Sequence, residues 1–367
     1  LLRGASTLEK RDEELLIELV NANGVPGNET QVSEVFKKHA APFAHDILRD
    51  GLGSVIAKHI GDKEGPRIYF SGHLDEVGFM VTQITEEGFI KFQPLGGWWE
   101  QVMLAQQVQV TTGQGRVLHG VIGSKPPHVL TPEARSTPYQ IADMFIDLGA
   151  TDAQMVEDWG VRPGDMITPY TEYRRMNDTK FLLAKAWDNR VGTAVSLKVL
   201  QQLAQDGHPN VLFAGSDVQE EVGLRGAQTS TNLVNPDIAF ALDTGTAGDT
   251  PGMTPKEADS TLGEGPQLLI YDGSMIPHRK LRDFVVDIAE ELKIPFQYAV
   301  IAGGGTDAGR MHLARNGVPS LAVTVPVRYL HSHVSMIHED DYLNTVKLVT
   351  EVVKRLDTNT VRKIREY

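Results

Sequence analysis

Amphipathic segments alternate with short apolar runs at both ends of the chain. Apolar residues recur every three to four positions over 8–21 and 29–41, which predicts two helices. The same period returns after Phe181 and predicts further helices in the C-terminal half. These later segments are 190–204, 278–292, 307–316 and 340–357.

Short apolar runs between these helices have the length of β-strands. Segments 46–57 and 67–71 are strand-like, and later runs lack polar alternation, which predicts strands buried on both faces. Helices that alternate with such strands are typical of a largely parallel sheet covered on both sides. We therefore predict a three-layer α/β/α domain built from 1–76 and 170–367. The later strand-like runs are 211–214, 238–242, 297–302 and 320–325.

The pattern changes between residues 77 and 169. Short segments such as 79–84 and 107–111 alternate apolar and polar residues, and glycines such as Gly113 and Gly115 interrupt them. This pattern predicts a smaller, mainly β domain inserted into the α/β domain. One helix is expected inside it, at roughly 138–159.

Composition narrows the chemistry. The 367 residues include no cysteine, so any metal must be held by histidines and carboxylates. The 35 Lys and Arg against 48 Asp and Glu give a formal net charge of −13, which argues against binding to a nucleic-acid backbone. Residues 1–10 lack the pattern of a secretion signal, and nowhere does an apolar run reach membrane-spanning length, so we expect a cytoplasmic protein without a membrane partner.

Five polar motifs follow the predicted strands. In open α/β sheets the loops at the carboxyl ends of the strands converge on ligands, so five such motifs indicate a site. Taken alone, Asp188 would most often cap a helix, and the pair Glu220 and Glu221 would most often be exposed charge. A single histidine, His73 or His331, is also most often structural. The five motifs are SGHLDE at 71–76, WDNR at 187–190, VQEEVG at 218–223, LDTG at 242–245 and YLHSH at 329–333.

Taken together, these motifs supply what a two-metal hydrolase needs. One carboxylate must bridge both ions, each ion needs further His or carboxylate ligands, and a free carboxylate must handle the proton of the attacking water. The adjacent Glu220 and Glu221 offer a ligand and a spare carboxylate. His331 and His333 are rival ligands two positions apart.

The sequence resembles the cytosolic co-catalytic metallo-aminopeptidases, which include glutamyl aminopeptidase and the tetrahedral self-compartmentalising enzymes. The resemblance covers essentially the whole chain and implies that Asp188 bridges two ions. His73 and Asp243 would complete one ion's ligands, and Glu221 and His331 those of the other. The motifs that carry the resemblance, besides the five above, are GVPG at 24–27, KPPH at 125–128, GGTDA at 304–308 and RYLHS at 328–332, the last of which favours His331 over His333.

The resemblance implies two further roles and an assembly. Glu220 would be the general base, and Asp75 would accept the second N–H of the His73 ring and so orient it. The implied reaction removes the N-terminal residue from short peptides through a metal-bridging hydroxide. Zinc suits the two sites best, with cobalt or manganese possible. The 77–169 insert resembles the dimerisation domain of the tetrahedral enzymes, which implies dimers that build a dodecamer.

Other functions stay open on the residues alone. A deacylase or carboxypeptidase could use the same sheet and ions, with basic residues aimed at a substrate carboxylate. A metal-free assembly or binding protein could keep the fold, although the full ligand set argues against it. A glycoside hydrolase that used Asp75 and Glu76 would leave both histidines without a role. The glycine run at 303–305 predicts either a helix start or backbone donors for a substrate.

Overall fold

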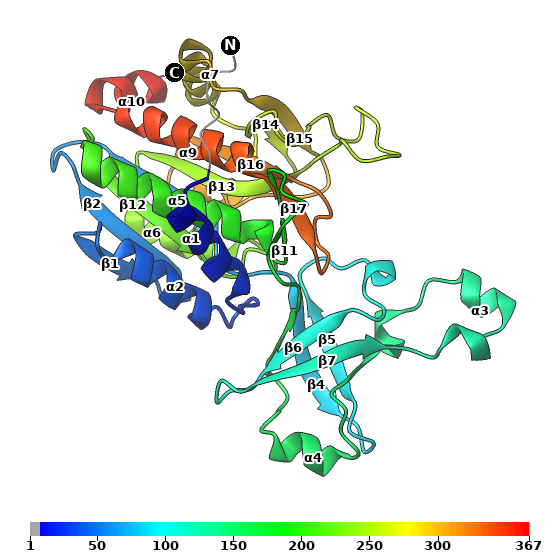
Figure 1. Ribbon diagram of the computed structural model, residues 1–367. Coiled ribbons are helices and arrows are strands. Elements are labelled where there is room, and N and C mark those ends of the chain that lie inside the picture. The colour runs from blue at the N-terminus through cyan, green and yellow to red at the C-terminus, as the bar shows by residue number, and fades with distance from the viewer. Residues whose placement is uncertain (1–7, 367) are drawn as a thin grey trace.

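The computed structural model describes residues 8–366, which form an α/β body and a smaller β-barrel (Figure 1). In this part of the chain one eight-stranded sheet runs through the body, in the order β1 (Asp46–Arg49), β2 (Val55–Ile60), β12 (Val211–Asp217), β3 (Arg67–His73), β13 (Ile238–Thr246), β16 (Ser320–Val327), β14 (Gln267–Asp272) and β15 (Gln297–Ile301). The central strands β12, β3, β13 and β16 are parallel, as are β14 and β15. The other neighbours are antiparallel. The largely parallel sheet is confirmed.

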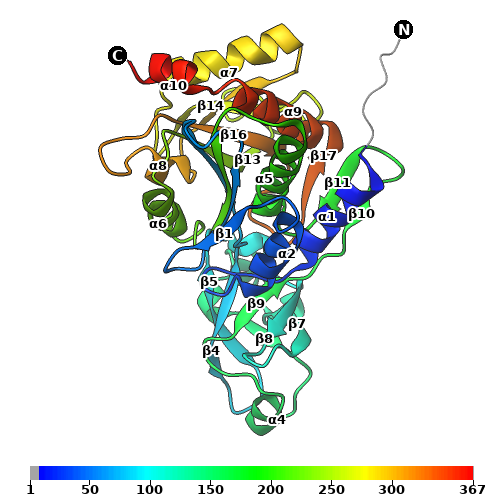
Figure 2. The same cartoon turned by 90° about the vertical axis from the view of Figure 1, so that its left-hand side faces the viewer.

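Helices cover both faces of the sheet (Figures 1 and 2). One face carries α1 (Lys10–Asn21), α2 (Thr30–Ala40), α5 (Trp187–Asp206), α7 (Arg279–Leu292), α9 (Glu339–Lys354) and α10 (Thr358–Arg365). The opposite face carries α6 (Arg225–Val234) and α8 (Ala308–Met311). The three-layer α/β/α arrangement follows.

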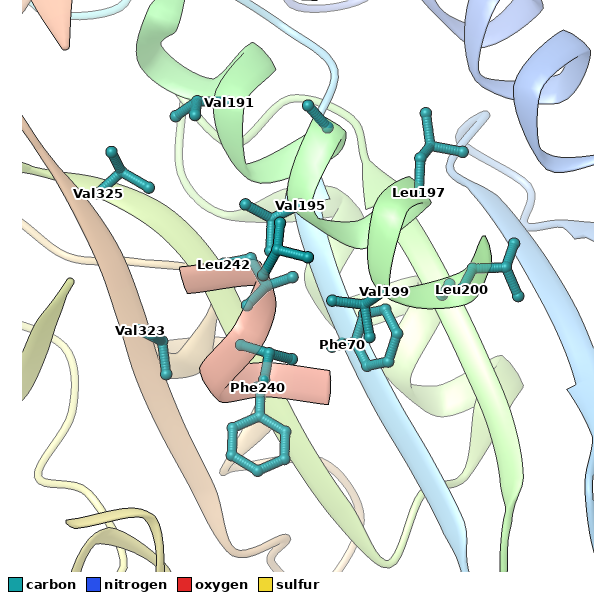
Figure 3. Packing of buried hydrophobic residues seen from close by; sticks show 14 of the residues in the cluster. Phe70, Val191, Val195, Leu197, Val199, Leu200, Phe240, Leu242, Val323 and Val325 are labelled. Atoms are coloured by element: carbon teal, nitrogen blue, oxygen red, sulfur yellow. The ribbon is translucent and has the colours of Figure 1, made fainter. Parts of the chain in front are cut away.

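Neighbouring residues of the central strands pack on opposite faces, because side chains alternate along a strand. Phe70 and Phe240 belong to the apolar cluster under α5, whereas Tyr69 and Ala239 belong to the cluster under α6 and α8. Figure 3 shows valines and leucines of α5 packed against the strands. Each such buried side chain stabilises the fold by about 1.5–3 kcal/mol. The sheet is therefore a rigid base for the loops at its edge.

The inserted segment forms a closed barrel with its own apolar core. Phe79, Val110 and Ile146 are fully buried in this core. An arm with the short helix α3 (Pro132–Ser136) projects from the barrel, and α4 (Ala153–Asp158) lies at the end far from the body (Figure 1). The barrel strands, in order around it, are β4 (Gly78–Ile84), β5 (Ile90–Leu95), β8 (Phe145–Asp147), β7 (Val117–Gly123), β6 (Gln107–Thr111) and β9 (Met166–Pro169).

The prediction of one helix over 138–159 is wrong. Met144 and Ile146 are buried two positions apart, which is the period of a strand, and the chain forms β8 there. Gly149 then takes a left-handed φ of 76°, and the helical structure in this window is limited to a short 3₁₀ turn at Ile141–Asp143 and to α4. The helix predicted at 307–316 is also too long, since α8 ends at Met311.

Two strand predictions need correction. Segment 46–57 is not one strand but the hairpin of β1 and β2, whose turn is held by Asp50. The Asp50 carboxylate accepts the N–H groups of Leu52, Gly53 and Ser54 at 2.9, 2.7 and 2.9 Å. β15 is not buried on both faces, because its alternate residues Tyr298 and Val300 are 51% and 53% exposed. The patterns also missed α6, α10, β14 and the small sheet of β10 (Arg174–Arg175), β11 (Phe181–Ala184) and β17 (Ser335–His338).

Between residues 8 and 366, none of the helices combines the length and the apolarity needed to cross a bilayer. The prediction that residues 1–10 carry no secretion signal rests mostly on residues 1–7, which lie outside the described part of the chain.

Candidate metal centre

The five polar motifs meet at the carboxyl ends of the central strands. His73 ends β3, and Asp243 lies in the second half of β13. Glu220 and Glu221 follow β12 directly, whereas Asp188 opens α5. His331 follows β16. Segments that are far apart in the sequence therefore place their side chains in one site, as expected for this edge of a parallel sheet.

Asp188 lies between the two histidines. Its Oδ1 is 3.3 Å from Nε2 of His73, and its Oδ2 is 3.3 Å from Nε2 of His331. Nε2 of His331 is also 3.4 Å from Oε2 of Glu221, and Nε2 of His73 is 3.8 Å from Oδ1 of Asp243. The Asp188 carboxylate thus joins two groups of donor atoms, which is the geometry that a bridging ligand needs.

The donor atoms fit divalent cations. His73, Asp188 and Asp243 offer atoms that all lie within 4.8 Å of one another, and so do Asp188, Glu221 and His331. An overlapping group contains His73, Glu220 and Glu221. Imidazole with carboxylate is a donor set that suits zinc and related ions. In the described chain, His333 belongs to none of these groups and instead packs its ring 5.2 Å from that of Trp98.

Several carboxylates face one another in this site. Burial raises the pKa of Glu221 to about 8 and that of Asp243 to about 7, and the charge of Asp188 adds to both shifts. Burial also opposes ionisation of Asp188, but its hydrogen bonds with His331 and His73 outweigh it and lower the pKa of Asp188. Like charges packed this closely need positive charge between them, which bound ions would supply.

Metal binding should therefore release protons and strengthen as pH rises. Burial lowers the pKa of His331, but its hydrogen bond to Asp188 and the charge of Glu221 raise it to about 9 overall. At neutral pH an ion must thus displace protons from His331 and Glu221. We expect zinc affinity to rise from about pH 6 to about pH 8, and binding heats at about pH 7 to depend on the buffer's ionisation enthalpy. Equal heats in all buffers would contradict this expectation.

Asp75 connects two of the ligand segments. Its two carboxylate oxygens accept the N–H groups of Glu220 and Glu221, each at 3.0 Å. Nδ1 of His73 is 2.9 Å from the main-chain oxygen of Asp75 and 3.5 Å from its carboxylate. The backbone carbonyl is therefore the nearer acceptor for the imidazole N–H, and the carboxylate that the family resemblance implies lies slightly farther away. Either acceptor leaves Nε2 of His73 facing Asp188.

Arg190 is a residue for which the sequence predicts no role, and it is fully buried beside the site. Its guanidinium donates to the carbonyl oxygens of Leu74 and Gly24 at 2.8 and 3.3 Å, and to the Glu76 carboxylate at 3.0 Å. Lys185 binds the same Glu76 oxygen. Arg190 thereby fastens the loop after His73 to the start of α5. In the sequence, Arg190 stands out only as the basic residue of the WDNR motif.

Arg190→Met should destabilise the protein by about 3–5 kcal/mol, the cost of breaking a buried ion pair, because Glu76 and several carbonyl groups lose donors. Denaturant unfolding of the metal-free protein measures the effect. Arg174→Met is the control, since Arg174 is 68% exposed and, among residues 8–366, its side chain pairs only with Glu172, at 3.5 Å. It should change stability by less than about 0.5 kcal/mol. Two variants of equal stability would rule out this role for Arg190.

A cleft of about 1390 Å³ opens from the candidate metal site. Its walls include residues 255–260, Ile270, and the segment from Tyr298 to Thr306. The glycine run at 303–305 lines this cleft, while the helix that follows it, α8, is only one turn long. A cleft of this volume can accommodate a few residues of an extended peptide.

Several known proteins of similar sequence and fold are peptidases. A glutamyl aminopeptidase of Lactococcus lactis subsp. cremoris is 36% identical, over 95% of this chain and 98% of its own length. The crystal structure of a TET aminopeptidase from a marine sediment archaeon of the Thaumarchaeota is 43% identical, with a TM-score of 0.94, covering 97% of this chain and 100% of the other. A Pyrococcus horikoshii TET1 peptidase that can assemble into a tetrahedron or a large octahedral shell is 32% identical, with a TM-score of 0.85, covering 94% and 100%.

The fold and these similarities define the class as aminopeptidases, which are hydrolases of peptide bonds. The chain belongs to the family described as M42 glutamyl aminopeptidase, whose model matches residues 53–348. A second family model, described as AMPT, matches residues 10–36. The family resemblance is confirmed, and so is the α/β architecture with a smaller β domain.

Proposed function

We propose that the chain is a dinuclear-metal aminopeptidase that removes the N-terminal residue from short peptides. The observation that carries the proposal is the Asp188 carboxylate, placed 3.3 Å from an imidazole nitrogen on each side. His73 and Asp243 would complete one metal site, and Glu221 and His331 the other. Two bound divalent ions would polarise the scissile carbonyl and lower the pKa of a shared water to give the bridging hydroxide. Zinc is the expected ion, with cobalt or manganese as alternatives.

Glu220 is the proposed general base. Its side chain is 10% exposed, and its Oε2 lies 3.7 Å from Nε2 of His73. It therefore faces the ligands without belonging to either proposed ion site. In that position it would take the proton of the attacking water and later deliver it to the leaving amine. Asp75 would position this base relative to the ligand Glu221, because it holds the N–H groups of both glutamates.

Recognition of the substrate's free ammonium group distinguishes an aminopeptidase from a deacylase or a carboxypeptidase. The excess of carboxylates in the site favours a positively charged amino terminus over a substrate carboxylate. A set of aminoacyl p-nitroanilides, their N-acetylated counterparts, and peptides blocked at one end or the other distinguishes the reactions. We expect turnover only where the amino terminus is free. Hydrolysis of N-acetyl amino acids, or of peptides from the carboxyl end, would instead establish a deacylase or a carboxypeptidase.

We also propose that the barrel region 77–169 is the dimerisation domain and that 1–76 with 170–367 form the catalytic domain. The projecting arm supports this proposal, since Val129 on it is 70% exposed and α3 lies far from the body (Figure 1). Dimers would build a hollow dodecamer that admits only short peptides. Cytoplasmic location stays a prediction.

Light scattering tests this assembly. At micromolar protein concentration with zinc present, the proposed dodecamer should have a mass near twelve times the 40.3 kDa of one chain. Symmetric closed assemblies of this kind are the usual outcome for soluble homo-oligomers. Val129→Glu, which places a charge on the arm, should reduce the mass, whereas Val117→Glu on the barrel wall serves as a comparison at an exposed valine. A monomer in the unchanged protein would contradict the proposal.

A further inference from the structure

A loop of the barrel reaches the candidate metal centre of the body. This loop, residues 96–99, follows β5 and carries the sequence GGWW. The main-chain oxygen of Gly97 lies 3.0 Å from Nδ1 of His331. A carbonyl oxygen can only accept, so Nδ1 of His331 must carry the proton. Nε2, which faces Asp188 and Glu221, is then the nitrogen that gives up its proton when an ion binds.

The two glycines of the loop allow this close approach. A Cβ atom at Gly97 would lie 3.2 Å from Nδ1 of His331. At Gly96, which has a φ of +85°, a Cβ atom would lie 3.4 Å from Cβ of Glu221 and 2.7 Å from Cγ1 of Val77. The loop thus packs against two ligands of the same proposed ion site. None of these contacts involves the ligands of the other site.

Trp98 anchors the loop between the barrel and the body. Its ring stacks on Phe79 of the barrel core with 4.6 Å between centroids, and its Nε1 donates to the Gly78 carbonyl at 3.1 Å. The same ring also lies 5.2 Å from that of His333, measured between centroids. The Thr171 hydroxyl donates to the His333 carbonyl at 2.7 Å. The position of the loop is therefore fixed relative to the segment that carries His331.

We infer that the inserted barrel contributes to the candidate metal centre, because the carbonyl group of Gly97 orients the proposed ligand His331. The inference rests on the proposed dinuclear function. His331 needs such support because its side chain is 35% exposed, whereas that of His73 is 1% exposed and is held by its own loop. The barrel loop accordingly sets the affinity of the ion bound by Asp188, Glu221 and His331, and leaves the ion on the His73 side unaffected.

Gly97→Ala tests this inference. Gly97 is not among the glycines with a positive φ, so its backbone accepts alanine, but the added Cβ pushes the His331 ring away from its carbonyl acceptor. The full chain, stripped with a chelator, is titrated with zinc by calorimetry. We expect the first ion to bind as in the unchanged protein and the second to bind about 10- to 100-fold more weakly, the usual effect of losing such a support. Excess zinc should restore turnover.

Gly113→Ala is the matched control in the same barrel, because its Cβ would meet only Oδ1 of Asp165 at 3.8 Å. It should bind both ions normally. His331→Ala sets the limit and should lose the second ion entirely, while His333→Ala should retain it. Equal weakening of both ions in Gly97→Ala, or no weakening, would overturn the inference. Fewer than two ions bound to the unchanged protein would instead overturn the proposed function.

Discussion

Asp188→Asn should lose both metal ions and lower kcat/KM by about 10⁴-fold or more, since the loss of two Lewis acids removes several kcal/mol of transition-state stabilisation. The variant keeps the size of the side chain and one carbonyl oxygen but loses the negative charge. Asp188 belongs to two candidate donor sets, one that contains His73 and one that contains His331. Its two oxygens lie equally close, at 3.3 Å, to His73 and His331.

Elemental analysis of ions per chain, beside steady-state kinetics, measures this effect. Asp243→Asn is the matched control, because Asp243 belongs only to the set with His73 and should therefore cost one ion. Asp188→Asn protein that retained two ions with normal affinity would show that Asp188 does not bridge them.

Glu220→Gln should keep its metal and lose turnover by about 10²- to 10⁴-fold, the range for removing a positioned general base. Glutamine preserves size and hydrogen bonding but cannot accept the proton. The adjacent Glu221→Gln should fail differently, because it weakens a ligand whose Oε2 lies 3.4 Å from Nε2 of His331. Metal occupancy should fall there along with activity.

The comparison is informative because both glutamates are held by the same carboxylate of Asp75, so local unfolding would affect them alike. Metal content and kinetics on one aminoacyl p-nitroanilide are measured for both variants. Near-normal turnover in Glu220→Gln would remove it as the base. Full occupancy in Glu221→Gln together with metal loss in Glu220→Gln would reverse the two assignments.

The sequence was most informative where a pattern has one structural solution. The helical period at 8–21 and the buried runs at 211–214 and 238–242 became α1, β12 and β13. Because parallel strands end at one edge, polar residues after those runs had to approach one another. That is why His73, which ends β3, could be placed in a site with residues distant in the sequence.

Other features depend on packing that local patterns do not encode. The window 138–159 contains both strand and helix periods, and pairing of Ile146 with Ile90 on the neighbouring strand β5 selects the strand. Arg190 acts through main-chain carbonyls of distant segments. Gly97 contributes a carbonyl oxygen, which every residue has, so no side-chain motif could have identified it.

We expect activity to need two ions per chain at the Asp188 site, and a zinc titration of chelator-treated protein measures this requirement. Ions bound and hydrolysis of an aminoacyl p-nitroanilide are followed in the same samples. Turnover should be negligible in the stripped protein and reach its full value only as the second ion binds, with protons released into the buffer. Full turnover in protein that holds no metal would contradict this expectation.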